Sequence, residues 1–111
     1  MGFAIFIPVK GPIESVTKRP TFKALQTYID GYVEAVYLTL TPDQVAVAQF
    51  NCNDPELDKV AAVIEKPKKV TWICNEEGKI QNLPENLRAT ELMNLDFPIV
   101  GNVVLFVGFT I

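Results

Sequence analysis

Histidine is absent from this chain of 111 residues. Its absence excludes Ser-His-Asp and Cys-His nucleophilic catalysis, histidine acid-base chemistry and the usual zinc sites. Two carboxylate pairs remain for acid-base work, Glu76 with Glu77 and Asp54 with Glu56. The first falls in an expected turn, and the second complements the positive end of an expected helix. Because phosphate-loop, calcium-loop and dinucleotide motifs are also missing, we expect a protein that is not an enzyme and that has no cofactor or metal.

Cysteine is scarce, with only Cys52 and Cys74. The first residues carry no positively charged leader, and in such a chain two cysteines are more often buried thiols than a disulfide. Without a histidine to deprotonate it, Cys74 is expected to be structural. No run approaches the roughly 18 consecutive apolar residues of a membrane span. We therefore expect a cytoplasmic protein that does not bind membranes.

Basic residues are outnumbered by acidic ones, 10 to 13, which gives a net charge of −3. They are scattered, except for Lys66, Lys68 and Lys69 around Pro67. Duplex nucleic acid requires an extended positive surface, so we expect no such partner. The short lysine run is typical of a solvated connection between a helix and a strand.

The remaining composition is that of a globular protein, with 49% hydrophobic and 21% charged residues. The chain can bury one core but is too short for two. We expect a single domain over residues 1–111.

Apolar and β-branched runs bounded by turn residues predict five or six strands. Thr41-Pro42-Asp43 is interpreted as the turn of a hairpin. The last strand is almost entirely apolar and should lie in the centre of the sheet, covered on both faces. The predicted strands are Phe3 to Val9, a weaker Ile13 to Arg19, Tyr32 to Leu40, Gln44 to Phe50, Lys69 to Cys74 and Gly101 to Thr110, with Ile80 and Gln81 beginning a return strand.

About three helices complete an α+β fold whose sheet is mixed or antiparallel. The first runs from Thr21 to Asp30, with Gly31 as its left-handed cap. The second follows the cap Asp54 and carries apolar residues at helical spacing. These are Leu57, Val60, Ala61 and Ile64. The third spans Leu83 to Met93, with Asn82 as its cap.

The third helix follows a predicted hairpin loop, Asn75 to Lys79, in which Gly78 supplies a positive φ. Helical periodicity places Asn86 and Thr90 on its inward stripe and Arg88 on its outward side. A buried, unpaired amide costs about 1 to 3 kcal/mol, so Asn86 needs partners from backbone, water or a ligand. It either ties the helix to the hairpin or marks a binding site, which Lys79 and Arg88 would share.

Two further residues are candidates for this site. Glu34 shares a strand face with Val36 and Leu38, where it either faces water or is a half-buried carboxylate near Arg88 or Lys79. Trp72 either belongs to the core or an interface, or provides a stacking surface for a ligand.

Four segments carry a resemblance to a known family. They are Asp30-Gly31-Tyr32-Val33-Glu34, Cys74-Asn75-Glu76-Glu77-Gly78-Lys79, Leu83-Pro84-Glu85-Asn86-Leu87-Arg88-Ala89-Thr90 and Ile99-Val100-Gly101-Asn102-Val103-Val104. Their order and spacing resemble a family of small domains of unknown function found in phages, plasmids and other mobile elements. The resemblance covers roughly Leu25 to Phe109 and departs from the family pattern at 41–69, which we interpret as an insertion.

The resemblance implies an accessory protein of a mobile element, in the host cytosol if it is phage-encoded, and it brings no assigned activity. It favours counter-defence or host-takeover roles. One hypothesis is a module that sequesters a small anionic, nucleotide-like ligand through Asn86, Thr90, Arg88, Lys79, Trp72 and Glu34, often at the interface of a homo-oligomer. The alternative is an inhibitor or adaptor that contacts a host protein through a sheet edge or the inserted helix.

Overall fold

The computed structural model describes residues 2–77 and 81–109, and in these ranges it confirms the predicted α+β class. The strands form one antiparallel sheet in the order β2-β1-β5-β4-β3. Its strands are β1 (Phe3–Ile7), β2 (Glu14–Val16), β3 (Val33–Leu40), β4 (Lys68–Asn75) and β5 (Val103–Val107). The helices are α1 (Phe22–Ile29), α2 (Pro42–Cys52), the 3-10 helix η1 (Pro55–Leu57), α3 (Asp58–Ala61) and α4 (Leu87–Met93).

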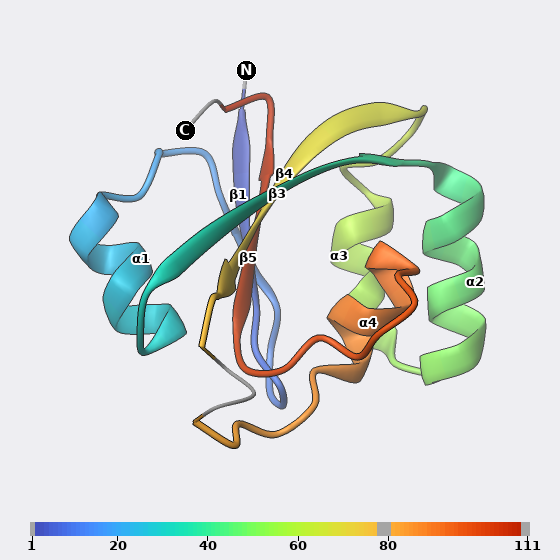
Figure 1. Cartoon of the computed structure of the whole chain (residues 1–111). Coiled ribbons are helices and arrows are strands. Elements are labelled where there is room, and N and C mark those ends of the chain that lie inside the picture. The colour runs from blue at the N-terminus through green and yellow to red at the C-terminus, as the bar shows by residue number, and fades with distance from the viewer. Residues whose placement is uncertain (1, 78–80, 110–111) are drawn as a thin grey trace.

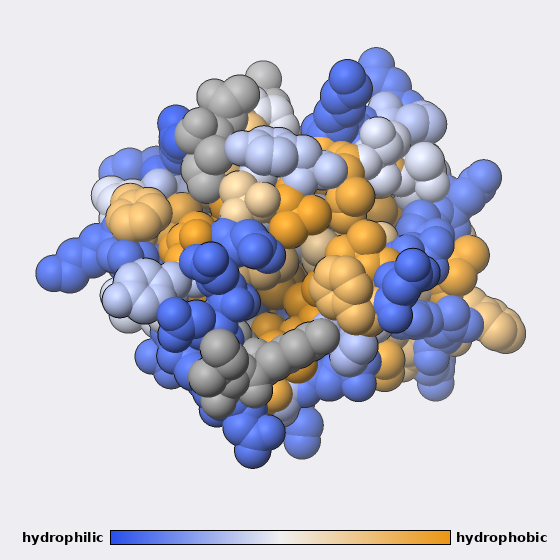
Figure 2. Space-filling model, in the orientation of Figure 1, coloured by the Kyte–Doolittle hydropathy of each residue, from blue (hydrophilic) through white to orange (hydrophobic). Residues whose placement is uncertain are grey.

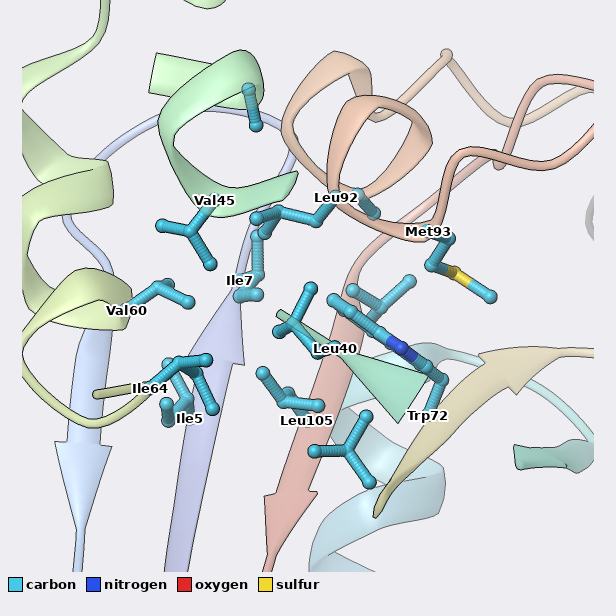
Figure 3. Packing of buried hydrophobic residues seen from close by; sticks show 14 of the residues in the cluster. Ile5, Ile7, Leu40, Val45, Val60, Ile64, Trp72, Leu92, Met93 and Leu105 are labelled. Atoms are coloured by element: carbon cyan, nitrogen blue, oxygen red, sulfur yellow. The ribbon is translucent and has the colours of Figure 1, made fainter. Parts of the chain in front are cut away.

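Strand β5 occupies the centre of the sheet, as its apolar sequence predicted, and all five of its residues are buried. Helices α2, α3 and α4 cover one face of the sheet and α1 the other (Figure 1). The larger core lies under the three helices, where Trp72 packs among Leu40, Met93 and Leu105 (Figure 3). A smaller core lies under α1 and consists of Ala4, Leu25, Ile29, Ile73, Val104 and Phe106.

The prediction of a return strand over Gln44 to Phe50 is wrong, because these residues belong to helix α2. The Thr41 side chain caps the helix by accepting a hydrogen bond from Gln44 N at 3.1 Å, and Pro42 occupies the first turn. Val45 and Ala48, three residues apart, are the buried side of the helix. Thr41-Pro42-Asp43 therefore begins a helix rather than a hairpin turn.

The second predicted helix is confirmed in its buried face but is shorter than expected. Asp54 accepts a hydrogen bond from Glu56 N at 3.0 Å, and a single 3-10 turn then leads into α3. Leu57, Val60 and Ile64 are buried as predicted.

The third predicted helix begins four residues later than expected, at Leu87 rather than Leu83. Residues 83–86 are instead extended, with Glu85 paired to Val100 and Gly101 N donating to Pro84 O at 2.8 Å. A proline disfavours helical backbone in the residue before it, so the helix cannot start upstream of Pro84. Asn86, not Asn82, is the cap.

Two smaller predictions near the hairpin are also wrong. The left-handed residue after α1 is Asp30, with φ of 61°, and not Gly31. Gly31 is required for another reason, since a Cβ there would lie 2.5 Å from Nδ2 of Asn75. Gln81 lies in a turn rather than a strand, and its N–H donates to Glu77 O at 2.9 Å. The predicted Gly78 turn and the start of the return strand at Ile80 lie outside the described residues.

Candidate functional site

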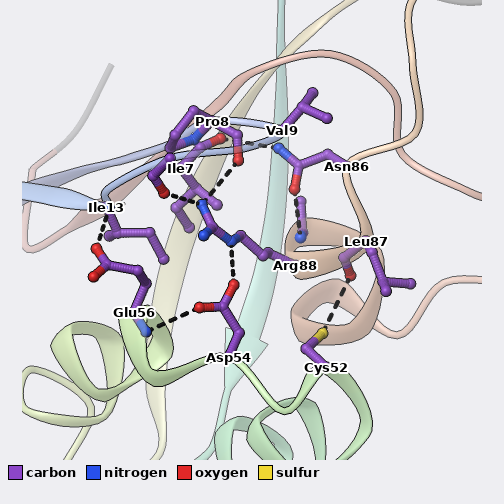
Figure 4. Close-up of polar contacts among 12 residues, drawn as sticks. Ile7, Pro8, Val9, Ile13, Cys52, Asp54, Glu56, Asn86, Leu87 and Arg88 are labelled. Carbon is purple, nitrogen blue, oxygen red and sulfur yellow. Dashed lines mark hydrogen bonds and ion pairs between the residues drawn. The ribbon is translucent and has the colours of Figure 1, made fainter.

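Asn86 makes three side-chain hydrogen bonds, all to the backbone of its own chain. Its Oδ1 accepts from Ala89 N at 3.0 Å, which caps α4, and its Nδ2 donates to Ile7 O at 2.9 Å and to Gly101 O at 3.0 Å (Figure 4). The side chain is fully buried. Asn86 thus ties the start of α4 to the end of β1 and to the approach to β5, which is a structural task, although the predicted tie was to the hairpin.

Thr90 is engaged in the same way one turn later. Its Oγ1 accepts from Ile99 N at 2.9 Å and lies 3.4 Å from Ile99 O. These contacts hold the segment before β5 against α4.

Arg88 is buried, so the prediction that it faces outward is wrong. Because the helix starts at Leu87, its side chain reaches back to the loop after β1 (Figure 4). Nη1 donates to Gly11 O at 2.7 Å and to Pro8 O at 3.3 Å, and Nε pairs with Asp54 Oδ2 at 2.5 Å. Burial alone would raise the pKa of Asp54, but hydrogen bonds from Arg88 and from Glu56 N outweigh it and hold that pKa below its usual range.

Glu56 and Lys59 hold the other end of the same loop. Glu56 Oε1 accepts from Ile13 N at 2.7 Å and from Lys59 Nζ at 2.8 Å, while Lys59 Nζ also donates to Ile13 O at 2.8 Å. The hydrogen bonds from Lys59 and from Ile13 N keep the pKa of Glu56 low. We call Asn86, Arg88, Asp54, Glu56 and Lys59 the loop clamp, because together they fix residues 7–13, from the end of β1 to Ile13.

The remaining predicted site residues are not brought to the loop clamp. Trp72 is fully buried in the larger core and offers no surface to a ligand. Glu34 is exposed on β3, directly across from Cys74. Burial, with a smaller contribution from Glu34, raises the pKa of Cys74 to about 12. Lys79 lies outside the described residues.

Both cysteines are free, as predicted, and Cys52 borders a small cavity of about 280 Å³ beside the loop clamp. The cavity is also lined by Lys10, Asp54 and Arg88. Burial and the nearby carboxylates of Glu91 and Asp54 raise the pKa of Cys52. The thiol is therefore poorly suited to act as a nucleophile at neutral pH.

A much larger hollow, which we call the sheet groove, lies on the α1 face of the sheet, beyond the area that α1 covers. Its volume is about 880 Å³, and it is lined by Tyr37, Leu38, Thr39, Lys69, Val70, Thr71, Gly108 and Phe109. Strand register explains the grouping, because Tyr37 is paired with Thr71 and Thr39 with Lys69. Side chains that alternate along a strand share a face, so these four stand on the same side of the sheet.

Phe109 forms one wall of the sheet groove. The chain turns after β5 at Gly108, whose φ is 82°. The ring of Phe109 then lies edge-on to Phe106, with centroids 5.8 Å apart, and directly over Gly2, where a Cβ would come within 2.5 Å of it. Glycine at position 2 thus provides the space for this wall.

The lining of the sheet groove is mainly apolar and carries one cationic group, an exposed tyrosine ring and two hydroxyls. Lys69 contributes an exposed ammonium group, Tyr37 a ring that is 67% exposed, and Thr39 and Thr71 hydroxyls. None of the described lining residues carries a carboxylate. Sequence reasoning missed this site, although Tyr37-x-Thr39 and Lys69-x-Thr71 do place polar side chains at alternating positions of two predicted strands.

Comparison with known proteins identifies no relative, because no family model, curated protein or solved structure matches the chain. Within residues 2–77 and 81–109, no three His, Cys, Asp or Glu side chains are grouped so that they could hold a metal ion. Over the same residues, the helices are all too short or too polar to cross a membrane.

Proposed function

We propose that this protein is a noncatalytic binding module that holds a small anionic, nucleotide-like ligand in the sheet groove. The observation that carries the proposal is the groove itself, which combines a lysine, an exposed tyrosine and two threonines around about 880 Å³. Ligand pockets typically measure about 300 to 1,000 Å³ and pair an apolar lining with a few polar groups.

Each part of such a ligand has a matching group. A phosphate would be bound by Lys69 as a compact positive charge. A base would stack on the Tyr37 ring, since base–aromatic stacking accepts any base. The Thr39 hydroxyl would donate to or accept from the sugar or the base edge. The proposal keeps the ligand class expected from the sequence and moves its site from α4 to the opposite face of the sheet.

The biological role we propose rests on the resemblance to mobile-element domains. A noncatalytic protein that binds a nucleotide signal lowers its free concentration in proportion to its own abundance. Sequestration of this kind would counter a host defence that depends on a nucleotide messenger.

Isothermal titration calorimetry against a panel of nucleotides and cyclic nucleotides tests the proposal. We expect binding by the wild type and at least a tenfold loss in Lys69→Met, because a charge-assisted hydrogen bond contributes about 1.5 to 3 kcal/mol. Lys66→Met is the matched control, since Lys66 is exposed and does not line the groove. If no ligand of the panel binds, or if the two variants lose affinity equally, the proposal fails.

Helix α2 favours a second candidate function, the protein–protein inhibitor. Phe50 is 85% exposed and Val47 is 47% exposed, both on the outer side of α2 and within the predicted insertion 41–69. Exposed aromatic residues are typical anchors of protein interfaces. A pull-down from host lysate with wild type and Phe50→Ser checks this function. The wild type should recover a stoichiometric partner protein, and Phe50→Ser should not.

A further inference from the structure

Strand β3 is one edge of the sheet. It pairs with β4 on one side and runs across the front of the molecule, and among residues 2–77 and 81–109 no other strand pairs with it (Figure 1). Apolar side chains gather in the middle of this face of the molecule, between hydrophilic margins (Figure 2). An edge of this kind is a template for another strand.

The register shows which backbone groups point outward. Glu76 N donates to Tyr32 O at 2.9 Å, so residue 32 bonds toward β4, and in an antiparallel ladder every second residue does the same. Val33, Ala35, Tyr37 and Thr39 therefore point their N–H and C=O groups away from the sheet. Among the described residues, these outward-pointing N–H and C=O groups have no hydrogen-bond partner.

The opposite edge of the sheet is protected, whereas β3 is not. Strand β2 is only three residues long, follows Pro12 and is followed by Lys18 and Arg19. Short length, proline and positive charge are the usual means of blocking an edge. Strand β3 has eight residues in unbroken register, contains no proline or lysine, and carries a single charge, Glu34.

We infer that β3 pairs with β3 of a second copy of this chain, antiparallel, around a two-fold axis at Val36. This register sets Val33 opposite Thr39 and Ala35 opposite Tyr37. It lets all four outward-pointing residues of each copy exchange both of their hydrogen bonds. A shift of two residues in one direction would place Thr39 opposite Gly31, beyond the strand. A shift in the other direction would require Thr41, whose carbonyl already accepts from Val45 N within α2.

The side chains fit the same register. The large Tyr37 side chain faces the small Ala35, and the half-buried Val36 faces its own copy. Glu34 lies opposite Leu38, so the two Glu34 carboxylates are four residues apart along the strands, roughly 13 Å. Like charges therefore do not meet at the interface.

The pairing would also complete the sheet groove proposed above. Tyr37 lines the groove and lies on the outermost strand, so a second β3 would continue the groove floor past it. A ligand in the groove would then touch both copies. The dimer is tested without any ligand, so a monomeric protein would contradict the dimer but not the ligand site. The binding of nucleotides by wild type and Lys69→Met tests the ligand site alone.

Cysteine cross-linking tests the axis directly. In a Cys52→Ser background, Val36→Cys places two thiols opposite each other at the axis, in a pair whose Cα atoms are about 4.5 Å apart. Leu38→Cys is the matched control, because its two copies would be separated by roughly 13 Å, beyond the about 7 Å that a disulfide can span. We expect a disulfide-linked dimer on a non-reducing gel for Val36→Cys alone. Equal cross-linking of the two variants, or none in either, overturns the proposal.

Light scattering after size exclusion gives the second test, with a mass twice the 12.4 kDa of one chain expected for the wild type. Ala35→Pro removes an outward N–H that makes no bond to β4, so it should yield a folded monomer. Far-UV circular dichroism and the melting temperature establish that the variant is folded. A wild-type mass of one chain at all micromolar concentrations tested contradicts the inference.

Discussion

The loop clamp and the sheet groove both gather polar side chains beside a cavity, but they differ in what those side chains bond to. In the clamp, Asn86 and Arg88 are directed at backbone carbonyls and at Asp54, all at hydrogen-bond distance. In the groove, Tyr37 and Lys69 extend into open space. Polar residues on the inner side of a helix therefore do not by themselves indicate a ligand. The informative property is bonding capacity that the fold leaves unused.

The largest expected effect is the loss of stability in Asn86→Ala. The change removes the cap of α4 and leaves the carbonyls of Ile7 and Gly101 buried without a donor. A lost cap costs about 1 kcal/mol and each of the two orphaned carbonyls about 1 to 3 kcal/mol, so we expect a loss of at least about 3 kcal/mol in the free energy of unfolding. Urea denaturation measures it.

Asn51→Ala is the control for this comparison, because Asn51 bonds to Glu91 on the exposed surface. It should change the free energy of unfolding by less than about 0.5 kcal/mol. If Asn86→Ala proved as mild as the control while abolishing nucleotide binding, the clamp would be the ligand site after all.

A smaller loss is expected for Asp54→Asn. Arg88 keeps its charge in a site where its side chain is 11% exposed, but it loses the carboxylate that neutralises it. Removing one partner of a mostly buried pair is strongly unfavourable, and with the remaining solvent contact we expect about 2 kcal/mol. Thermal unfolding measures the loss. Asp58→Asn is the control, because it removes one negative charge from an exposed position on α3, and it should lower the melting temperature less than Asp54→Asn does.

The clamp should also make stability depend on pH in the acid range. The folded protein lowers the pKa of Asp54, so the folded state binds fewer protons than the unfolded chain. The stabilisation is complete above the unfolded pKa of about 3.9 and is lost as pH falls through the lower folded value. Between pH 6 and pH 3, the free energy of unfolding should fall less in Asp54→Asn than in wild type, as measured by denaturation at each pH. An identical acid dependence in the two proteins would rule out this contribution.

The difference between clamp and groove also explains what the sequence could and could not predict. Apolar runs identified β1, β3, β4 and β5, because burial on a sheet leaves a local pattern in each strand. Helix α2 was missed because a Thr-Pro-Asp segment begins helices as well as turns. The choice between the two depended on the packing of Val45 and Ala48 against distant strands.

The two sites depend on non-local structure to different degrees. The sequence predicts that the amide of Asn86 needs partners, but its role follows from where α4 begins, and the start at Leu87 goes with the pairing of residues 84–86 to residues 99–101. The groove unites residues from β3, β4 and the turn after β5, and only the pairing of β3 with β4 and of β4 with β5 brings them together. A strand pattern specifies a face but not the neighbouring strand, so no single segment could predict this site.

The smallest stability effect and the sharpest functional contrast are expected for Tyr37→Ser. The Tyr37 ring is 67% exposed, so its removal should change the free energy of unfolding by less than about 0.5 kcal/mol. Loss of stacking should weaken nucleotide binding by about 1 to 3 kcal/mol, fivefold or more in Kd. Tyr32→Ser, which removes a similarly exposed ring outside the groove, should leave both quantities unchanged. Calorimetry and denaturation on the two variants would thus show whether the Tyr37 ring is needed for ligand binding but not for folding.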